Sequence, residues 1–296
     1  MNLTQVNERL ASLGLDPVAI EALVRATIAE DLDGGVDVTT VATVPAEQRS
    51  QLDFVAHAPG VLAGVVVAQL VFAVVAQDSG ATVELVAELA DGSRVADGDV
   101  VLSVRGTTRD LLTAERTALN LLGPLSGVAT ATAAWADLLD GSVTKVRDTR
   151  KTTPLLRSLQ KYAVRCGGGV NHRMSLSDAA LIKDNHVVAA GGVTQAFAAV
   201  RRQFPGLAVE VEVDSLEQLD EVVDAGADLV LLDNFTVEQM AEAVRRVGGR
   251  ARLEASGGLT LADAAAVATT GVDYVAVGAL THSAPVLDIG ADLHEL

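Results

Sequence analysis

The chain has 296 residues, of which 49% are hydrophobic, and it carries a formal net charge of −17 and a single cysteine. This length supports two domains or one barrel with an appendage, and the apolar content excludes an intrinsically disordered protein. The negative charge argues against a nucleic-acid partner, which would need an extended basic surface. One cysteine excludes an intrachain disulfide framework, so we expect a reducing compartment, the cytoplasm.

The sequence predicts no membrane partner. The first residues are polar and lack the apolar core of a signal peptide. The longest apolar run, Val61–Ala76, is interrupted by Gln69 and is too short to span a bilayer comfortably. We therefore expect this run to form a buried helix.

The first hundred residues mix helical and extended patterns without a regular repeat. Asp16-Pro17 has the form of a helix start, and Asp97-Gly98-Asp99 has the form of a turn. The expected elements are two helices and two strands: Val18–Glu30, Gln51–Ala56, Gly64–Gln77 and Val100–Val104. This mixture predicts a small α+β domain. A helical stretch over Arg109–Leu139 follows, with an expected interruption around Gly123-Pro124.

From residue 144 short apolar strands alternate with helices. Six strands are expected, at Thr144–Arg147, Ala180–Lys183, Ala208–Val213, Leu229–Leu232, Arg252–Ala255 and Tyr274–Val277. Helices should separate them, at Pro154–Cys166, Val193–Phe204, Leu216–Ala225, Val237–Val247 and Leu261–Thr269. This alternation predicts a parallel sheet with right-handed crossovers, either an incomplete β/α barrel or an open doubly wound sheet. No dinucleotide fingerprint follows any strand, which disfavours a Rossmann fold.

A basic island lies between Lys145 and Lys183. It holds nine Lys or Arg residues and two acids, a local charge of +7 within an acidic protein. Such a concentration indicates a pocket for a small, highly charged anion. Inside it, His172 and Arg173 follow a run of three glycines, and Arg173 can grip a carboxylate or phosphate through two bonds. The histidines and Cys166 have no zinc-ligand spacing.

Polar residues follow the predicted strands, at the edge where parallel sheets place their chemistry. Successive strands supply two basic and then two acidic groups, namely Arg150-Lys151, Lys183, Glu212 and Asp233. Glu210 shares its strand parity with Glu212, and we prefer Glu212 because it lies nearer the strand's end. The alternative is that these charges only cap strand ends and pair with one another.

Two glycine-containing loops near the end of the repeat are candidates for holding a phosphate. Ser256-Gly257-Gly258 precedes a helix expected to begin near Thr260, and Gly278-Ala279-Leu280 follows the last strand. Glycines let backbone N–H groups approach an anion, and a helix N-terminus favours negative charge. The alternative for each loop is an ordinary turn.

Taken together, these residues resemble the quinolinate phosphoribosyltransferase family. The resemblance rests mainly on DTRKTTPLLRSLQKYAV (148–164) and GGGVNHRMSLSDAALIKDNH (167–186). It extends to EDLDGGVDVTT (30–40), ERTALNLLGPLSGVAT (115–130), VEVEVDSLEQL (209–219), LLDNF (231–235), EASGG (254–258) and GVDYVAVGALTHS (271–283). These stretches run through nearly the whole chain.

The resemblance implies an α/β fold with an N-terminal sandwich domain over residues 1–115 and an incomplete β/α barrel over 116–283. It leaves the C-terminal tail, 284–296, to pack on the sandwich. The implied activity transfers phosphoribose from phosphoribosyl pyrophosphate to quinolinate with loss of CO2, in NAD biosynthesis. Mg²⁺ accompanies the donor and no organic cofactor is needed. The implied assembly is a homodimer, or dimers of it, with each active site shared across the interface.

The resemblance also assigns residues. Lys151, Lys183, Glu212 and Asp233 are expected to be catalytic, with Glu212 and Asp233 on the metal side. Arg116 should reach the partner subunit's site. The other substrate-binding residues are expected to be Thr149, Arg150, His172, Arg173, Ser256, Gly257, Gly258, Gly278, Ala279 and Leu280.

Three other functions remain open from the residues alone. A related phosphoribosyltransferase could act on nicotinate or another ring acid and would release no CO2. A non-catalytic anion-binding barrel would not need the Glu212 and Asp233 pair. A third class of barrel enzyme would use Lys183 as a Schiff base.

Overall fold

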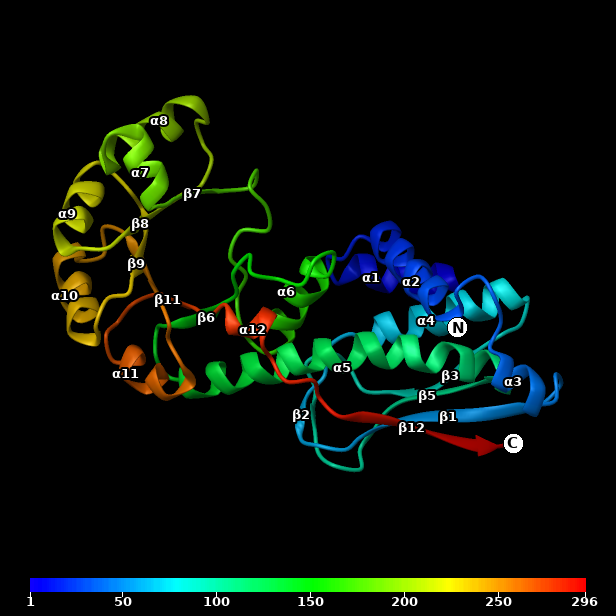
Figure 1. Ribbon diagram of the computed structural model, residues 1–296. Coiled ribbons are helices and arrows are strands. Elements are labelled where there is room, and N and C mark those ends of the chain that lie inside the picture. The colour runs from blue at the N-terminus through cyan, green and yellow to red at the C-terminus, as the bar shows by residue number, and fades with distance from the viewer. The chain divides into compact units, whose positions relative to one another are not determined.

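The computed structural model describes residues 1–296, which form two compact units (Figure 1). The first unit contains Met1–Ala131, Pro154–Gly168 and Ser283–Leu296, and the second contains Thr132–Thr153 and Gly169–His282. None of the helices combines the length and the apolar character that a bilayer crossing requires. The domain division expected between residues 115 and 116 stays a prediction.

A four-stranded antiparallel sheet organises the first unit. Its strand order is β12 (Ile289–Glu295), β1 (Arg49–Ala56), β5 (Val100–Thr107) and β3 (Glu84–Glu88). Along β1 every second residue is buried, as expected for a strand with one face on a core. The end of the chain therefore lies beside β1, visible as the red strand next to the blue one in Figure 1. A separate two-stranded pair joins β2 (Gly60–Val61) and β4 (Arg94–Val95).

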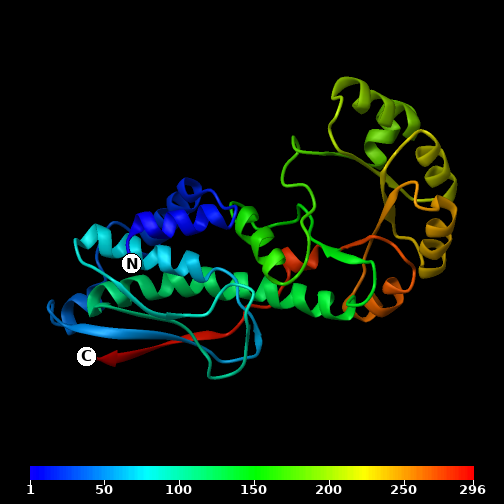
Figure 2. The same cartoon turned by 180° about the vertical axis from the view of Figure 1, so that it is seen from behind.

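Helices of the first unit lie on one side of this sheet in both views (Figures 1 and 2). They are α1 (Leu3–Ser12), α2 (Pro17–Leu32), α3 (Val38–Thr43), α4 (Val65–Ser79), α6 (Arg157–Cys166) and the part of α5 (Thr108–Leu138) that ends at Ala131. Residues Val65–Ala76 of α4 are all buried, so the long apolar run is a core helix as predicted. Asp16 caps α2 by accepting hydrogen bonds from the amides of Val18 and Ala19.

The expected break in the helix at Gly123-Pro124 is wrong, because α5 continues through Pro124 for 31 residues. Gly123 and Gly127, on either side of the proline, contact the C-terminal segment of the chain. A Cβ at Gly127 would lie 2.0 Å from the carbonyl oxygen of Pro285, and the amide of Leu287 donates to the oxygen of Gly123. The C-terminal segment thus packs into a notch on α5. We attribute the unbroken helix to this burial, which offsets the roughly 3 kcal/mol cost of an interior proline.

The second unit contains the predicted parallel sheet, and its six strands are confirmed. Their order is β6 (Lys145–Arg147), β11 (Tyr274–Ala276), β10 (Arg252–Ser256), β9 (Leu229–Asp233), β8 (Val209–Val213) and β7 (Ala180–Ile182). The sheet leaves β6 and β7 as its two edges, so the barrel is incomplete. Helices α8, α9 and α10 lie outside the strands in both views (Figures 1 and 2).

The helices of this unit follow the predicted alternation, with two unexpected short helices and a different start to a third. Their bounds are α7 (Asp184–Ala190), α8 (Val193–Gln203), α9 (Leu216–Asp224), α10 (Val237–Val247), η1 (Leu261–Asp263), α11 (Ala264–Ala268) and α12 (Ala279–His282). The short helices α7 and α12 were not expected, and α11 has the different start. The helix predicted over Leu261–Thr269 begins as the 3₁₀ turn η1, which Thr260 and Asp263 cap reciprocally.

Candidate active site

A cavity of about 640 Å³ lies in the second unit, at the carboxyl ends of the parallel strands. It is bordered by residues from every strand end of the sheet, which is where β/α folds assemble their sites. Thirteen of the predicted site residues line it: Thr149, Arg150, Lys151, His172, Arg173, Lys183, Glu212, Asp233, Ser256, Gly257, Gly258, Gly278 and Ala279. The structure thus brings together residues that are up to 130 positions apart in the chain.

The rim of the cavity carries a lysine and a glutamate in contact. Nζ of Lys183, at the end of β7, lies 2.8 Å from Oε2 of Glu212 on β8. The side chain of Lys183 is 47% exposed and that of Glu212 is 14% exposed. Asp233 ends the next strand, β9, and accepts a hydrogen bond from the side-chain amide of Asn234 at 2.8 Å. Two carboxylates and one ammonium group therefore share this side of the cavity.

Lys151 is placed by the last turn of the unit. The hydroxyl of Thr281 in α12 donates to the carbonyl oxygen of Lys151 at 2.9 Å. A Cβ at Gly278 would lie 3.2 Å from Cδ of Lys151 and 3.2 Å from Nε2 of His282. A larger residue at Gly278 would therefore press on both side chains and shift them by a few tenths of an ångström.

Asp148 explains how the basic loop is fixed to the sheet. It is fully buried, and its carboxylate accepts from the side-chain amide of Asn171 at 2.5 Å and from the backbone amide of His172 at 2.9 Å. The backbone amide of Val170 also donates to Val146 on β6 at 2.9 Å. These bonds hold the segment before His172 against the open edge of the sheet.

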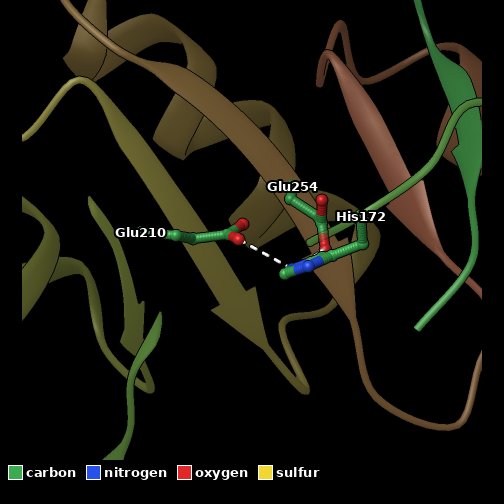
Figure 3. Close-up of side chains that lie close together, drawn as sticks. All are labelled: His172, Glu210 and Glu254. Atoms are coloured by element: carbon green, nitrogen blue, oxygen red, sulfur yellow. Dashed lines mark ion pairs between the residues drawn. The ribbon is translucent and has the colours of Figure 1, made fainter. Parts of the chain in front are cut away.

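Beneath the rim lies a buried charged cluster, the floor, formed by Arg147, His172, Glu210 and Glu254, of which His172 and Glu254 border the cavity. Nε2 of His172 lies 2.7 Å from Oε2 of Glu210 and 3.7 Å from Oε1 of Glu254. Figure 3 shows both carboxylates pointing toward the imidazole. Arg147 pairs with Oε2 of Glu254, and its guanidinium carbon lies 4.5 Å from the centre of the Tyr274 ring. Burial, together with the nearby charge of Glu210, raises the pKa of Glu254 to about 7.

Several polar atoms around the floor are buried and lack a hydrogen-bond partner. They are Nε of Arg147, Arg150 and Arg173 and one oxygen each of Glu210 and Glu254. Burial, and then the charge of Arg150, lowers the pKa of Arg173. Since unsatisfied buried donors are costly, the guanidinium Nε–H groups of Arg150 and Arg173 are suited to receive an anion.

The glycine loop after β10 is tightly packed. Gly257 has a φ of +103°, and a Cβ there would lie 2.3 Å from Oδ1 of Asn234 and 2.8 Å from its backbone nitrogen. Only glycine fits both conditions. The helix expected near Thr260 begins as the short turn η1, where Asp263 accepts from the amide and hydroxyl of Thr260, and support for an anion from this helix start stays a prediction.

Two predicted site residues do not border the cavity. Leu280 is buried in α12, with its side chain in the core. Arg116 belongs to the first unit, where its side chain is 61% exposed and lies 3.9 Å from Glu115. Arg157, Lys161 and Arg165 of the basic island also belong to that unit, on α6, and Lys161 is fully buried.

Sequence reasoning missed two ionisable residues of the cavity, His282 and Glu254. His282 was considered only as a zinc ligand. Its position four residues after Gly278, at the spacing of one helical turn, was the signal that could have placed it beside the loop. Glu254 lies two residues before Ser256 on β10 and so shares its strand face.

Two family models cover most of the chain. The quinolinate phosphoribosyl transferase N-terminal domain matches residues 37–126, and the C-terminal domain of the same family matches residues 128–292. The chain is 55% identical over 273 residues to a nicotinate-nucleotide pyrophosphorylase [carboxylating] of Mycobacterium leprae, covering 91% of this chain and 95% of that protein. A probable enzyme of the same name from Bacillus subtilis is 38% identical, over 88% of this chain and 89% of its own.

Solved structures agree with these matches. NadC from Streptococcus pyogenes superposes with a TM-score of 0.90 at 42% identity, covering 95% of this chain and 99% of that chain. The nicotinate-nucleotide pyrophosphorylase of Francisella tularensis superposes with a TM-score of 0.88 at 37% identity, covering 93% of this chain and 96% of that chain. With both family domains matched and the relatives covered nearly end to end, the chain belongs to the quinolinate phosphoribosyl transferase family.

Proposed function

We propose that this enzyme transfers phosphoribose from phosphoribosyl pyrophosphate to the ring nitrogen of quinolinate and removes the 2-carboxylate. The products are nicotinate mononucleotide, pyrophosphate and CO2, and the reaction belongs to NAD biosynthesis. The observation that carries the proposal is one cavity lined both by basic side chains, Arg150, Lys151, Arg173 and Lys183, and by acidic ones, Glu212 and Asp233 at the rim and Glu254 at the floor. The basic side chains suit a dianionic ring acid and a polyphosphate donor, and the acidic side chains suit a developing ribosyl cation.

Binding is supported by the cations. Two unit charges 4 Å apart interact by about 4 kcal/mol at an effective dielectric constant near 20. Arg150 and Arg173 offer buried Nε–H groups without a protein partner, suited to the carboxylates of quinolinate. Leu181 and Leu231 also line the cavity and offer apolar surface to the pyridine ring.

For ribosyl transfer, we assign the lysines and the carboxylates opposite roles. Lys151 and Lys183 stabilise the departing pyrophosphate, on which negative charge grows. Glu212 and Asp233 stabilise the oxocarbenium-like ribose or accept hydrogen bonds from its hydroxyls. The contact between Lys183 and Glu212 keeps this acidic side from repelling the donor before the substrates bind.

The carboxylates also fit Mg²⁺, which prefers oxygen ligands and commonly uses one or two carboxylates together with substrate phosphates. Glu212 and Asp233 supply such oxygens on the same cavity, and bound Mg²⁺ would neutralise part of the pyrophosphate charge. The 5′-phosphate is assigned to Ser256, Gly257 and Gly258 and to Gly278 and Ala279, where packed loops expose backbone amides.

Decarboxylation follows from the first step. Once ribosylated, the ring nitrogen is cationic and accepts the electron pair left at C2 when the C2–carboxylate bond breaks. CO2 leaves, and C2 takes a proton from Lys151 or from water. The protein's role is to hold the ring in place and to keep the 2-carboxylate oriented.

We further propose a homodimer in which Arg116 acts on the partner's cavity. Its exposed side chain, which has only its neighbour Glu115 as an ion-pair partner, supports this role. The unpaired Cys166 supports a cytoplasmic location.

The test is an assay with quinolinate radiolabelled at the 2-carboxylate, phosphoribosyl pyrophosphate and Mg²⁺. We expect equal amounts of CO2 and nicotinate mononucleotide, and no product when nicotinate replaces quinolinate. Ribosylation of nicotinate without use of quinolinate would instead support the related phosphoribosyltransferase. Binding of both substrates without product would support a non-catalytic anion-binding protein.

A further inference from the structure

The charged cluster at the cavity floor has a defined proton arrangement. The backbone N–H of Arg173 donates to Nδ1 of His172 at 2.7 Å. A backbone amide is always the donor, so Nδ1 must offer its lone pair. A neutral imidazole with a free lone pair on Nδ1 carries its proton on Nε2, which then donates to Oε2 of Glu210 at 2.7 Å.

This arrangement argues against a metal in the cluster. His172, Glu210 and Glu254 have ligand atoms within 4.8 Å of one another, close enough for one cation. A metal bound at Nε2 would have to displace its proton while Nδ1 still accepted from Arg173, which a neutral imidazole cannot do. Arg147 already supplies the positive charge that Glu254 needs.

The same arrangement changes the expected role of His172. Both of its ring nitrogens have protein partners, although the residue borders the cavity. The resemblance implied that it lines the anion pocket beside Arg173. In the structure its Nδ1 accepts a hydrogen bond from the main chain of Arg173, a residue that also lines the cavity.

Two groups of Arg173 form hydrogen bonds within the protein, and a third, Nε, has no partner. Its amide bonds to His172, and its Nη1 donates to the carbonyl oxygen of Ala179 at 3.0 Å. Its Nε is buried and without a partner, on a side chain that lines the cavity. The two anchors set the direction of the guanidinium, and the third position is left for a ligand.

We propose that Glu210 is a positioning residue for quinolinate binding, acting through His172 on Arg173. Its carboxylate fixes the Nε2–H tautomer, which leaves Nδ1 to anchor the Arg173 main chain and so aims the guanidinium at a quinolinate carboxylate. The identity of the ligand rests on the proposed function. Glu210 itself is 3% exposed and does not border the cavity.

The first measurement is magnetic resonance of the wild-type protein with isotope-labelled histidine, which distinguishes the tautomers of all five histidines. We expect a hydrogen-bonded Nε2 proton whose signal disappears in His172→Asn, whereas the signals of His186, whose Nδ1 also accepts a backbone amide, and of His294, whose Nε2 lies 3.2 Å from Oδ2 of Asp53, should remain. A proton on Nδ1 of His172 would overturn the proposal, whatever the variants show. This result does not depend on the substrate, so it separates the positioning role from the proposed function.

The second measurement is steady-state kinetics of variants at Glu210. Glu210→Leu removes the acceptor and should raise the KM for quinolinate by about tenfold or more, while kcat and the KM for phosphoribosyl pyrophosphate change less than about threefold. Glu210→Gln keeps an acceptor oxygen and should stay within about threefold of wild type in all three constants. If Glu210→Leu does not fold, Glu210→Asp withdraws the carboxylate and should raise the same KM selectively.

A double-mutant cycle tests whether the effect passes through Arg173. In an Arg173→Lys background, Glu210→Leu should change the KM for quinolinate by less than about twofold. Full additivity of the two changes would overturn the proposal, as would an unchanged KM in Glu210→Leu. Equal losses in kcat and in both KM values would indicate general damage and would also overturn it.

The matched control is Tyr162→Phe, in the first unit. It removes one hydrogen bond to a carboxylate away from the cavity, because the Tyr162 hydroxyl donates to the half-buried Asp91 at 2.7 Å. We expect it to lower the melting temperature without raising the KM for quinolinate. A rise matching that of Glu210→Leu would mean that the KM reports stability alone, which would contradict the proposal.

Discussion

Glu210 and Glu212 lie two residues apart on the same face of β8, yet only Glu212 borders the cavity. Glu212 reaches the rim and pairs with the half-exposed Lys183, whereas Glu210 lies in the floor and bonds to the buried His172. An exposed ion pair contributes about 0–1 kcal/mol to stability, while breaking a buried one costs several. The comparison indicates that rim charges are available for chemistry and floor charges hold the site together.

The largest expected effect is a loss of turnover when a lysine of the cavity is removed. Lys151→Ala and Lys183→Ala should each lower turnover by about 10²–10³-fold or more, because each removes a cation facing the departing pyrophosphate. Because the side chain of Lys183 is half-exposed, Lys183→Ala should change the melting temperature little. Rates of nicotinate mononucleotide formation near wild type in either folded variant would contradict the assigned roles.

The next prediction tests whether the rim is completed by a second subunit. Arg116→Ala and Lys183→Ala should each be nearly inactive alone. Mixed in equal amounts after proven subunit exchange, they should recover about a quarter of wild-type activity, because half of the dimers are hybrids with one intact site. Absence of recovery would count against a shared site.

The raised pKa of Glu254, in the floor, should make the stability of the protein depend on pH. Glu254 has a pKa raised to about 7, so between about pH 4.5 and 7 the folded state holds a proton that the unfolded state has released. Its contribution to stability is therefore present at low pH and is lost as the pH rises through this window, by on the order of 3 kcal/mol. Denaturant titrations at several pH values should show this fall in the wild type.

Glu254→Gln is the comparison for that measurement, because glutamine does not titrate. The difference in unfolding free energy between wild type and variant should change across the window in the stated direction. A constant difference from pH 4.5 to 7 would show that the Glu254 carboxyl titrates in the ordinary range for glutamate.

The smallest effect is expected in the first unit, away from both the rim and the floor of the cavity. Tyr162→Phe should lower the unfolding free energy by about 0.5–1.5 kcal/mol, since it removes the phenol donor from the half-buried Asp91, which keeps the amide of Val65 as a donor. Burial already raises the pKa of Asp91. Turnover should remain within about twofold of wild type, since neither residue borders the cavity. A selective loss of turnover would show that buried charge in the first unit also serves catalysis.

Periodicity was sufficient to predict the parallel sheet, because the strands are short β-type runs, several of them apolar, and each is separated from the next by a helix. It could not predict β12, whose sequence, Ile289–Glu295, becomes a strand only through pairing with β1. It was misled at Pro124, where packing of the C-terminal segment against α5 outweighs the local preference for a break. In both cases the missing information was a contact between distant parts of the chain.

The candidate site was predictable where one strand end gives one residue, as for Lys183 and Asp233. The site was less predictable where two residues on one strand face lie at different depths below the rim. Alternation placed Glu210 and Glu212 on one face, but only the neighbouring strands and His172 decide which carboxylate reaches the rim. The burial of Leu280 could not be predicted for a similar reason, because the loop after β11 turns into α12.

The most direct test of the account is a crystal structure of the enzyme with quinolinate bound. We predict that quinolinate lies in the cavity beside Lys151 and Lys183, with a carboxylate on Nε of Arg173 and with His172 still bonded to Glu210. Quinolinate bound outside this cavity would contradict the account. So would an imidazole of His172 turned away from Glu210 to bind the ligand directly.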